Sequence, residues 1–140
     1  MEVLKRIADL AAGDARIAIQ TLRYASYNAE IKGKQKIEED EVKQGFEKAS
    51  EIKRKYILQR LGKHYQLIYE IVRENAGITS GELFSIYRDR CKKLGLSPIS
   101  NRSISNYIKT LQNIHLIKTE KAGIRGNVRK FYVSKDFLNV

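Results

Sequence analysis

This 140-residue sequence has one cysteine, one proline, no tryptophan and no long hydrophobic run. Because Cys91 is the only cysteine, no disulfide can form within the chain, and a reducing compartment is the natural expectation. No apolar run reaches the roughly 18 residues that a membrane-spanning helix needs. These absences predict a cytoplasmic protein with no membrane partner.

Residues that mark catalytic or metal sites are also scarce. The two histidines, His64 and His115, fall in different predicted elements and lack the spacing of zinc ligands. The sequence contains no G-x-S-x-G elbow, no paired-carboxylate site and no G-x-x-x-x-G-K-[ST] phosphate loop. The acidic run 38–41 fits a helix start, where carboxylates face the positive end of the helix dipole. We therefore expect no enzymatic activity and no metal or cofactor bound by this chain alone.

Acidic residues are missing from one long stretch of the chain. Between residues 90 and 119 there is no Asp or Glu, and from 90 to 135 eleven Lys or Arg residues accompany a single acid, Glu120. The formal net charge is +11, and most of it lies in the second half of the sequence. Such polarised positive charge indicates a polyanionic partner, for which nucleic acid is the usual candidate.

The first 62 residues show the apolar spacing of helices. Residues 1–62 predict a small bundle of three helices, in which Asp14 caps the second helix, expected over 14–32. The apolar pattern breaks at Gly62 and then restarts. We therefore place a domain boundary there and expect a second domain over residues 63–140.

Residues 63–140 predict three helices followed by a β-hairpin. The second of these helices begins at Thr79-Ser80-Gly81-Glu82, which has the form of a capping box, and Ser100 can cap the third. After Leu116 the apolar pattern becomes that of strands, interrupted by the Gly-containing segment 123–127. Three helices and then a two-stranded hairpin is the order of a winged-helix domain. The predicted fold is therefore mainly α, a helical bundle followed by a winged helix.

The third helix of this second domain has the polar face expected of a helix that reads DNA. Asn, Arg, Ser and Lys side chains can bond to base edges in the major groove without repelling phosphates. The predicted DNA-binding residues on this helix are Arg102, Ser103, Ser105, Asn106 and Lys109. An ordinary solvated face is the alternative, but exposed helices usually mix acids with bases.

The predicted hairpin adds a second group of basic residues. Arg125 lies between two glycines at the tip, where a narrow loop could deliver a guanidinium into a minor groove or along a row of phosphates. Lys121, Arg129 and Lys130 flank it and are predicted to contact DNA as well. A basic solvated loop is the alternative interpretation.

Three segments of the chain resemble one family of proteins. Residues 10–23, Leu-Ala-Ala-Gly-Asp-Ala-Arg-Ile-Ala-Ile-Gln-Thr-Leu-Arg, resemble the sensor-2 helix in the lid domain of AAA+ replication initiators. Residues 61–67 and 87–98 resemble the start of the winged helix in that family and its next helix and turn. Over nearly its whole length, the chain is similar to the C-terminal part of archaeal origin-recognition/cell-division-cycle (Orc/Cdc6-type) initiators, a lid followed by a winged helix.

This resemblance implies a role in DNA replication, with binding to double-stranded origin DNA at the nucleoid. The replicative helicase and other initiator paralogues are further candidate partners. The resemblance also implies that Arg16 is the sensor-2 arginine, which reaches the γ-phosphate of ATP in a preceding ATPase domain. ATP or ADP and Mg are therefore expected only with a full-length protein.

Two other functional classes fit the same residues. One is a free-standing winged-helix transcriptional regulator that dimerises through its N-terminal helices. The other is a protein-interaction module, whose winged helix contacts the replicative helicase while its basic face is incidental.

Overall fold

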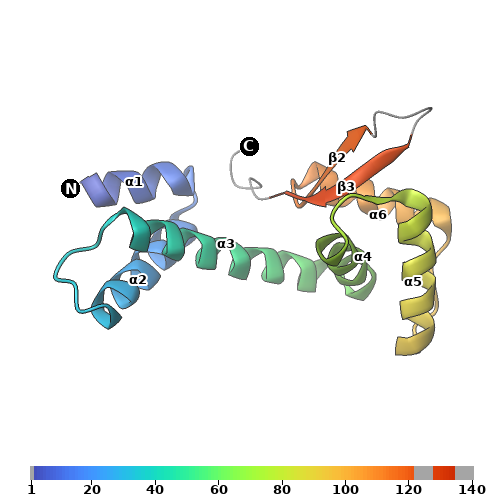
Figure 1. The fold of residues 1–140 in the computed structure, drawn as a ribbon, viewed down its shortest axis with the longest axis horizontal. Coiled ribbons are helices and arrows are strands. Elements are labelled where there is room, and N and C mark those ends of the chain that lie inside the picture. Colours follow the sequence, from blue (N-terminus) through green and yellow to red (C-terminus); the bar gives the residue numbers. More distant parts are fainter. Residues whose placement is uncertain (1, 122–127, 135–140) are drawn as a thin grey trace. The chain divides into compact units, whose positions relative to one another are not determined.

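The computed structural model describes residues 2–121 and 128–134. Contacts divide the chain into two compact units, an N-terminal unit up to Ile57 and a C-terminal unit from Leu58 (Figure 1). No helix among these described residues is long and apolar enough to cross a membrane.

The N-terminal unit is built from α1 (Glu2–Ala11), α2 (Ala15–Ile31) and most of α3 (Glu39–Leu61). Its described residues form helices and turns, which confirms the helical bundle predicted for this part of the sequence. Asp14 caps α2 as expected, because its carboxylate accepts a hydrogen bond from the N–H of Ile17 at 3.1 Å.

Small residues allow α2 and α3 to approach closely within the N-terminal unit. Gly45 of α3 is buried, and a Cβ atom at this position would lie 2.6 Å from the carbonyl oxygen of Thr21 and 3.0 Å from the backbone nitrogen of Ala25. Both of these neighbours are backbone atoms of α2, which cannot move aside as a flexible side chain would. Any residue larger than glycine at this position would therefore push the helices apart.

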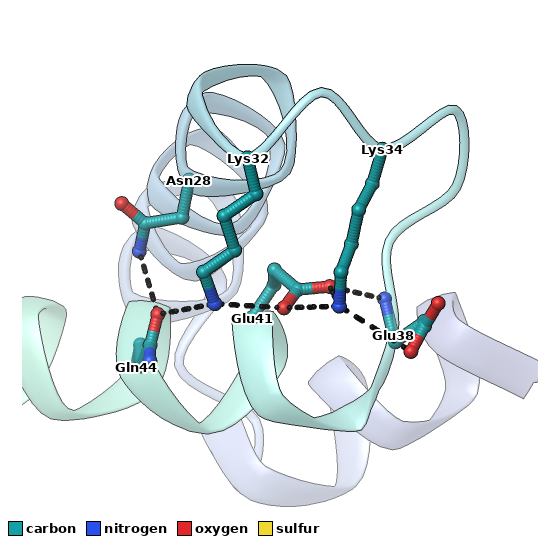
Figure 2. Close-up of polar contacts among 6 residues, drawn as sticks. All are labelled: Asn28, Lys32, Lys34, Glu38, Glu41 and Gln44. Atoms are coloured by element: carbon teal, nitrogen blue, oxygen red, sulfur yellow. Dashed lines mark hydrogen bonds and ion pairs between the residues drawn. The ribbon is translucent and has the colours of Figure 1, made fainter.

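The loop between α2 and α3 is fixed by a buried carboxylate. Glu41 is fully buried in the first turn of α3, where its Oε1 accepts the N–H of Glu38 at 2.9 Å. Figure 2 shows the ammonium groups of Lys32 and Lys34 at the same carboxylate, 3.0 and 3.1 Å from Oε2. These hydrogen bonds, first that of Glu38 and then that of Lys32, lower the pKa of Glu41 to about 2. The acidic run is thus a helix start, as predicted, and one of its members also anchors the loop.

The C-terminal unit contains three helices and a small antiparallel sheet (Figure 1). Its elements are α4 (Lys63–Glu74), β1 (Ile78–Thr79), α5 (Ser80–Leu94), α6 (Asn101–Asn113), β2 (Ile117–Lys121) and β3 (Arg129–Val133). The helices pack on one another and on the sheet around a core whose fully buried members include Ile68, Ile71, Val72, Leu83, Ile104, Leu111 and Leu116. This arrangement confirms the predicted winged helix.

The sheet has one strand more than the predicted hairpin. β1 pairs with β3, so that the strand order is β1-β3-β2, with Ile78 opposite Phe131. Gly77 has a positive φ of 85°, and its N–H donates to the carbonyl of Phe131 at 2.9 Å. A two-residue strand has no periodicity that a sequence could reveal, because its pairing partner lies about fifty residues away in the chain.

Candidate nucleic-acid interface

α6 presents most of its predicted DNA-binding residues on one exposed strip. Its buried side consists of Ile104, Ile108 and Leu111, at the 4- and 3-residue spacing of an amphipathic helix. On the other side, the exposed residues include Arg102, Ser105, Asn106 and Lys109. Arg102 and Lys109 have no acidic partner among the residues that the structure describes. The strip therefore offers two unpaired cations with a hydroxyl and an amide between them.

Ser103 is placed differently from the other four predicted residues of α6. Its side chain is half-buried, and its N–H donates to the Oγ of Ser100, the N-cap of the helix, at 3.1 Å. The two hydroxyl groups also bond each other at 3.0 Å. In the free protein, the Ser103 hydroxyl is thus part of the helix cap.

The described wing residues lie on two faces of the hairpin. Lys121 stands directly opposite Arg129, on the face that carries the buried side chain of Phe131 farther along β3. Lys130 lies on the other face, opposite Glu120. The exposed cations Lys121 and Arg129 thus form a cross-strand pair, whereas the charge of Lys130 is partly offset by its neighbour. The predicted contact of Arg125 falls outside the described residues.

Two groups of side chains hold α6 and the turn that precedes it, and sequence reasoning did not identify either. Tyr107 of α6 stacks on Tyr65 of α4, with ring centroids 4.0 Å apart and planes inclined by 3°. Tyr87 of α5 is completely buried, and its hydroxyl lies 2.7 Å from the Nδ1 of His64 and accepts the N–H of Ile99 at 3.1 Å. Burial raises the pKa of Tyr87 to about 12.

A further side-chain contact lies where α6 begins. Arg88 of α5 donates a hydrogen bond to the side-chain oxygen of Asn101, the first residue of α6. Both residues are exposed. The only sequence signal for this contact was the general excess of basic residues in this region.

Arg16 lies in the N-terminal unit, in the first turn of α2. It is exposed, and it has no ion pair among residues 2–121 and 128–134. Beside it, a groove of about 380 Å³ runs between the start of α2 and the second half of α3 and has Ile17, Ala49 and Ile52 among its lining residues. Asp14 at the rim pairs with Lys53 at 2.6 Å, and this hydrogen bond lowers the pKa of the Asp14 carboxyl. A cation without an ion pair among the described residues thus lies at the start of α2.

No described group of three or more His, Cys, Asp or Glu residues is placed to hold a metal ion. The two features left to explain are the strip on α6 and the cation at the start of α2.

Comparison with family models covers both units. Residues 1–47 match the Cdc6 AAA+ ATPase-type lid domain, and residues 59–140 match the C-terminal winged-helix domain of CDC6. The chain belongs to the Cdc6 family. In this Cdc6-family chain, the lid match covers α1, α2 and the start of α3, and the winged-helix match begins just before α4.

Curated relatives of the Cdc6-family chain are archaeal replication proteins. ORC1-type DNA replication protein 9 of Halobacterium salinarum is 33% identical over 118 residues, which are 84% of this chain and 32% of the relative. The ORC1-type DNA replication protein of Pyrococcus horikoshii is 35% identical over 126 residues, 84% of this chain and 30% of that protein. The chain thus spans about a third of the length of these relatives.

A solved structure has the same fold. The ORC1 protein of Aeropyrum pernix, determined in complex with DNA, matches with a TM-score of 0.62 and 24% sequence identity. The match covers 99% of this chain and 39% of that one. The fold of this chain is therefore found within that protein.

Proposed function

We propose that this chain is the part of an archaeal replication initiator that binds double-stranded origin DNA, with α6 in the major groove and the wing near a minor groove. The observation that carries the proposal is the exposed strip of Arg102, Ser105, Asn106 and Lys109, which has no acid on its helix and lies on a winged helix of the Cdc6 family. That the Aeropyrum pernix relative was determined with DNA supports this choice of ligand.

The side chains of the strip suit two kinds of DNA contact. An arginine can donate two hydrogen bonds to the O6 and N7 of guanine, and an asparagine can pair with the N6 and N7 of adenine. Arg102 and Asn106 are therefore the proposed base-reading residues. Lys109, with its single ammonium group, suits a phosphate, which would fix the position of the helix but read no sequence. Ser105 suits either role, and a base contact from Ser103 would require its capping hydroxyl to turn.

The wing would add backbone contacts beside the groove that α6 occupies. Lys121 and Arg129 stand opposite each other across the hairpin and can neutralise neighbouring phosphates. Lys130, opposite Glu120, is expected to contribute less. Arg125 stays a proposed minor-groove contact.

In the full-length protein, we propose that Arg16 acts as the sensor-2 arginine and contacts the γ-phosphate of ATP, bound with Mg by an ATPase domain outside this sequence. Its exposed position at the start of α2 supports this role. The chain alone would then have no ATPase activity. The lid would couple the state of the nucleotide to the placement of the winged helix on DNA.

Fluorescence anisotropy tests the DNA-binding proposal. The chain is titrated onto a duplex carrying archaeal origin repeats and onto a scrambled duplex of the same composition, at several salt concentrations. We expect tighter binding to the origin duplex at every salt concentration, and a log-log salt slope close to −0.9 for each phosphate contacted. Equal affinity for both duplexes would leave only non-specific binding. No binding at low salt would leave the interaction with a helicase or another initiator as the better explanation.

One observation favours a second function, the dimeric transcriptional regulator. The side chains of Ile19, Tyr27 and Ile31 are each about 60% exposed and lie on one face of α2, at intervals of eight and four residues. In an initiator, the rest of the protein could cover this face. A stable dimer in sedimentation equilibrium, with a preference for palindromic DNA, would favour the regulator, whereas a monomer would favour the initiator.

A further inference from the structure

The hydroxyl group of Tyr87 connects three segments of the C-terminal unit. The side chain belongs to α5 and has no solvent exposure. Its oxygen accepts the backbone N–H of Ile99, in the turn between α5 and α6, and lies against His64 of α4. An apolar residue would fill the same space, so the hydroxyl calls for an explanation beyond packing.

The direction of these two hydrogen bonds follows from their donors. The N–H of Ile99 can only donate, so the Tyr87 oxygen accepts from it and the phenolic proton is left to be donated. At 2.7 Å, the Nδ1 of His64 is placed to accept that proton. In this arrangement the Nδ1 atom of His64 acts as the hydrogen-bond acceptor. Cys91, which also forms a side-chain hydrogen bond with the hydroxyl, and Tyr107 are the other titratable groups that raise the pKa of Tyr87.

These hydrogen bonds lie next to the start of α6. Ile99 directly precedes Ser100, the N-cap of α6, so the hydroxyl fixes the backbone one residue before the helix begins. Near the middle of the helix, Tyr107 stacks on Tyr65 of α4. His64 and Tyr65 are consecutive in α4, and the first turn of that helix therefore holds α6 near its N-terminus through Tyr87 and near its middle through Tyr107.

We propose that the buried Tyr87 hydroxyl, held between His64 and the N–H of Ile99, is a positioning group that sets where α6 lies on DNA. This inference rests on the proposed function of α6. Base edges accept hydrogen bonds only from side chains in the right place, whereas phosphate contacts tolerate small shifts. Loss of the hydroxyl should therefore reduce discrimination between sequences more than overall affinity.

The test uses Tyr87→Phe, which keeps the ring and removes the oxygen. We expect the ratio of the affinities for the origin and scrambled duplexes to fall by about 3- to 10-fold, while affinity for the scrambled duplex and the salt slope stay unchanged. Ile71→Val is the control, since Ile71 is a fully buried residue of α4 that also loses packing but makes no polar contact with α6. His64→Leu completes a double-mutant cycle, in which the two effects on the ratio should not add if the hydroxyl acts with His64.

A measurement without DNA separates this inference from the proposed function. In NMR spectra, Tyr87→Phe should shift the His64 ring nitrogens and speed the exchange of the Ile99 amide, and residual dipolar couplings should show a reorientation of α6 relative to α4. Ile71→Val should cause none of these changes. If α6 keeps its orientation in Tyr87→Phe, or if Ile71→Val lowers the affinity ratio equally, the positioning role is wrong. If the wild-type chain shows no preference for the origin duplex while α6 still reorients, the positioning role stands and the proposed function fails.

Discussion

The two units of this chain use their charged residues in different ways. In the N-terminal unit, acids and bases pair across elements, as in Arg6 with Glu39 and Lys53 with Asp14. In the C-terminal unit, Arg73 of α4 and Arg90 of α5 also form ion pairs with acidic residues. From α6 onward, the sequence contains almost no acidic residue. Paired charges of this kind contribute to the position of helices, whereas the unpaired cations of α6 are available to a polyanion. The N-terminal unit thus uses paired charges to fix its helices, whereas the C-terminal unit leaves cations exposed on α6.

The first prediction concerns a substitution that should destabilise the N-terminal unit and leave the exposed strip on α6 unchanged. Gly45→Ala would put a methyl group against the backbone of α2, and we expect it to destabilise the N-terminal unit by up to about 3 kcal/mol. Hydrogen exchange should speed up in α2 and the first half of α3, while α5 and α6 stay protected. Gly81→Ala is the matched control, because a methyl group there meets no atom within 4 Å. Equal destabilisation by both substitutions would contradict the close crossing of α2 and α3.

The second prediction concerns a substitution that should weaken DNA binding and leave the stability of the fold unchanged. Arg102→Ala takes an exposed guanidinium from α6, and we expect a loss of about 1–3 kcal/mol in affinity for the origin duplex if it contacts a guanine. The thermal midpoint should not change, because the side chain has no partner among the described residues. The control is Arg23→Ala, which removes the same charge from an exposed position on α2. A similar loss of affinity in both variants would mean that net charge, rather than the strip on α6, governs binding.

Local signals in the sequence were enough to predict much of this fold. Asp14, Thr79 and Ser100 cap helices in the structure as the sequence indicated, because a cap depends on residues within one turn. The winged-helix order followed from the change of apolar spacing after Leu116. The exposed strip on α6 followed from the same spacing, since a helix that buries one side must expose the other.

The parts that were missed depend on contacts between residues far apart in the chain. β1 exists because β3 pairs with it, and His64, the half-buried partner of Tyr87, lies 23 residues earlier in the sequence. Glu41 looked like any acid in the first turn of a helix, yet it is buried and pairs with Lys32 and Lys34, which precede α3. The pairing of Lys121 with Arg129 and of Glu120 with Lys130 likewise depends on the strand register, which composition does not determine.

The third prediction concerns acid and should affect the two units unequally. The pKa of Glu41 is lowered from 4.5 to about 2, so its carboxylate stabilises the folded N-terminal unit above about pH 4.5, and this contribution is lost as the pH falls toward 2. The lowered pKa of Asp14 acts in the same direction. Melting curves followed by circular dichroism at decreasing pH should therefore show α1–α3 unfolding before the winged helix.

Glu41→Gln separates this carboxylate from the others. The amide keeps the size of the side chain but cannot pair with Lys32 and Lys34, so the variant should be less stable at neutral pH and lose less stability on acidification. Glu51→Gln provides the control, because Glu51 is exposed and its ion pair with Lys48 is long, at 4.0 Å. An acid dependence that is the same in all three proteins would assign the effect to other groups.

The prediction with the smallest expected effect tests whether backbone strain at His115, in the C-terminal unit, contributes to DNA binding. α5 and α6 end alike, with Gly95 at φ 68° and His115 at φ 63°, each followed by a leucine whose N–H bonds to the carbonyl five residues earlier. A left-handed conformation costs His115 about 1 kcal/mol that glycine avoids. His115→Gly should therefore raise the free energy of unfolding by about 0.5–1 kcal/mol, and Gly95→Ala should lower it by a similar amount.

If His115→Gly stabilises the chain and leaves DNA affinity unchanged, the strain has no role in binding. A drop in affinity would instead add His115 to the binding surface and extend that surface beyond the strip on α6.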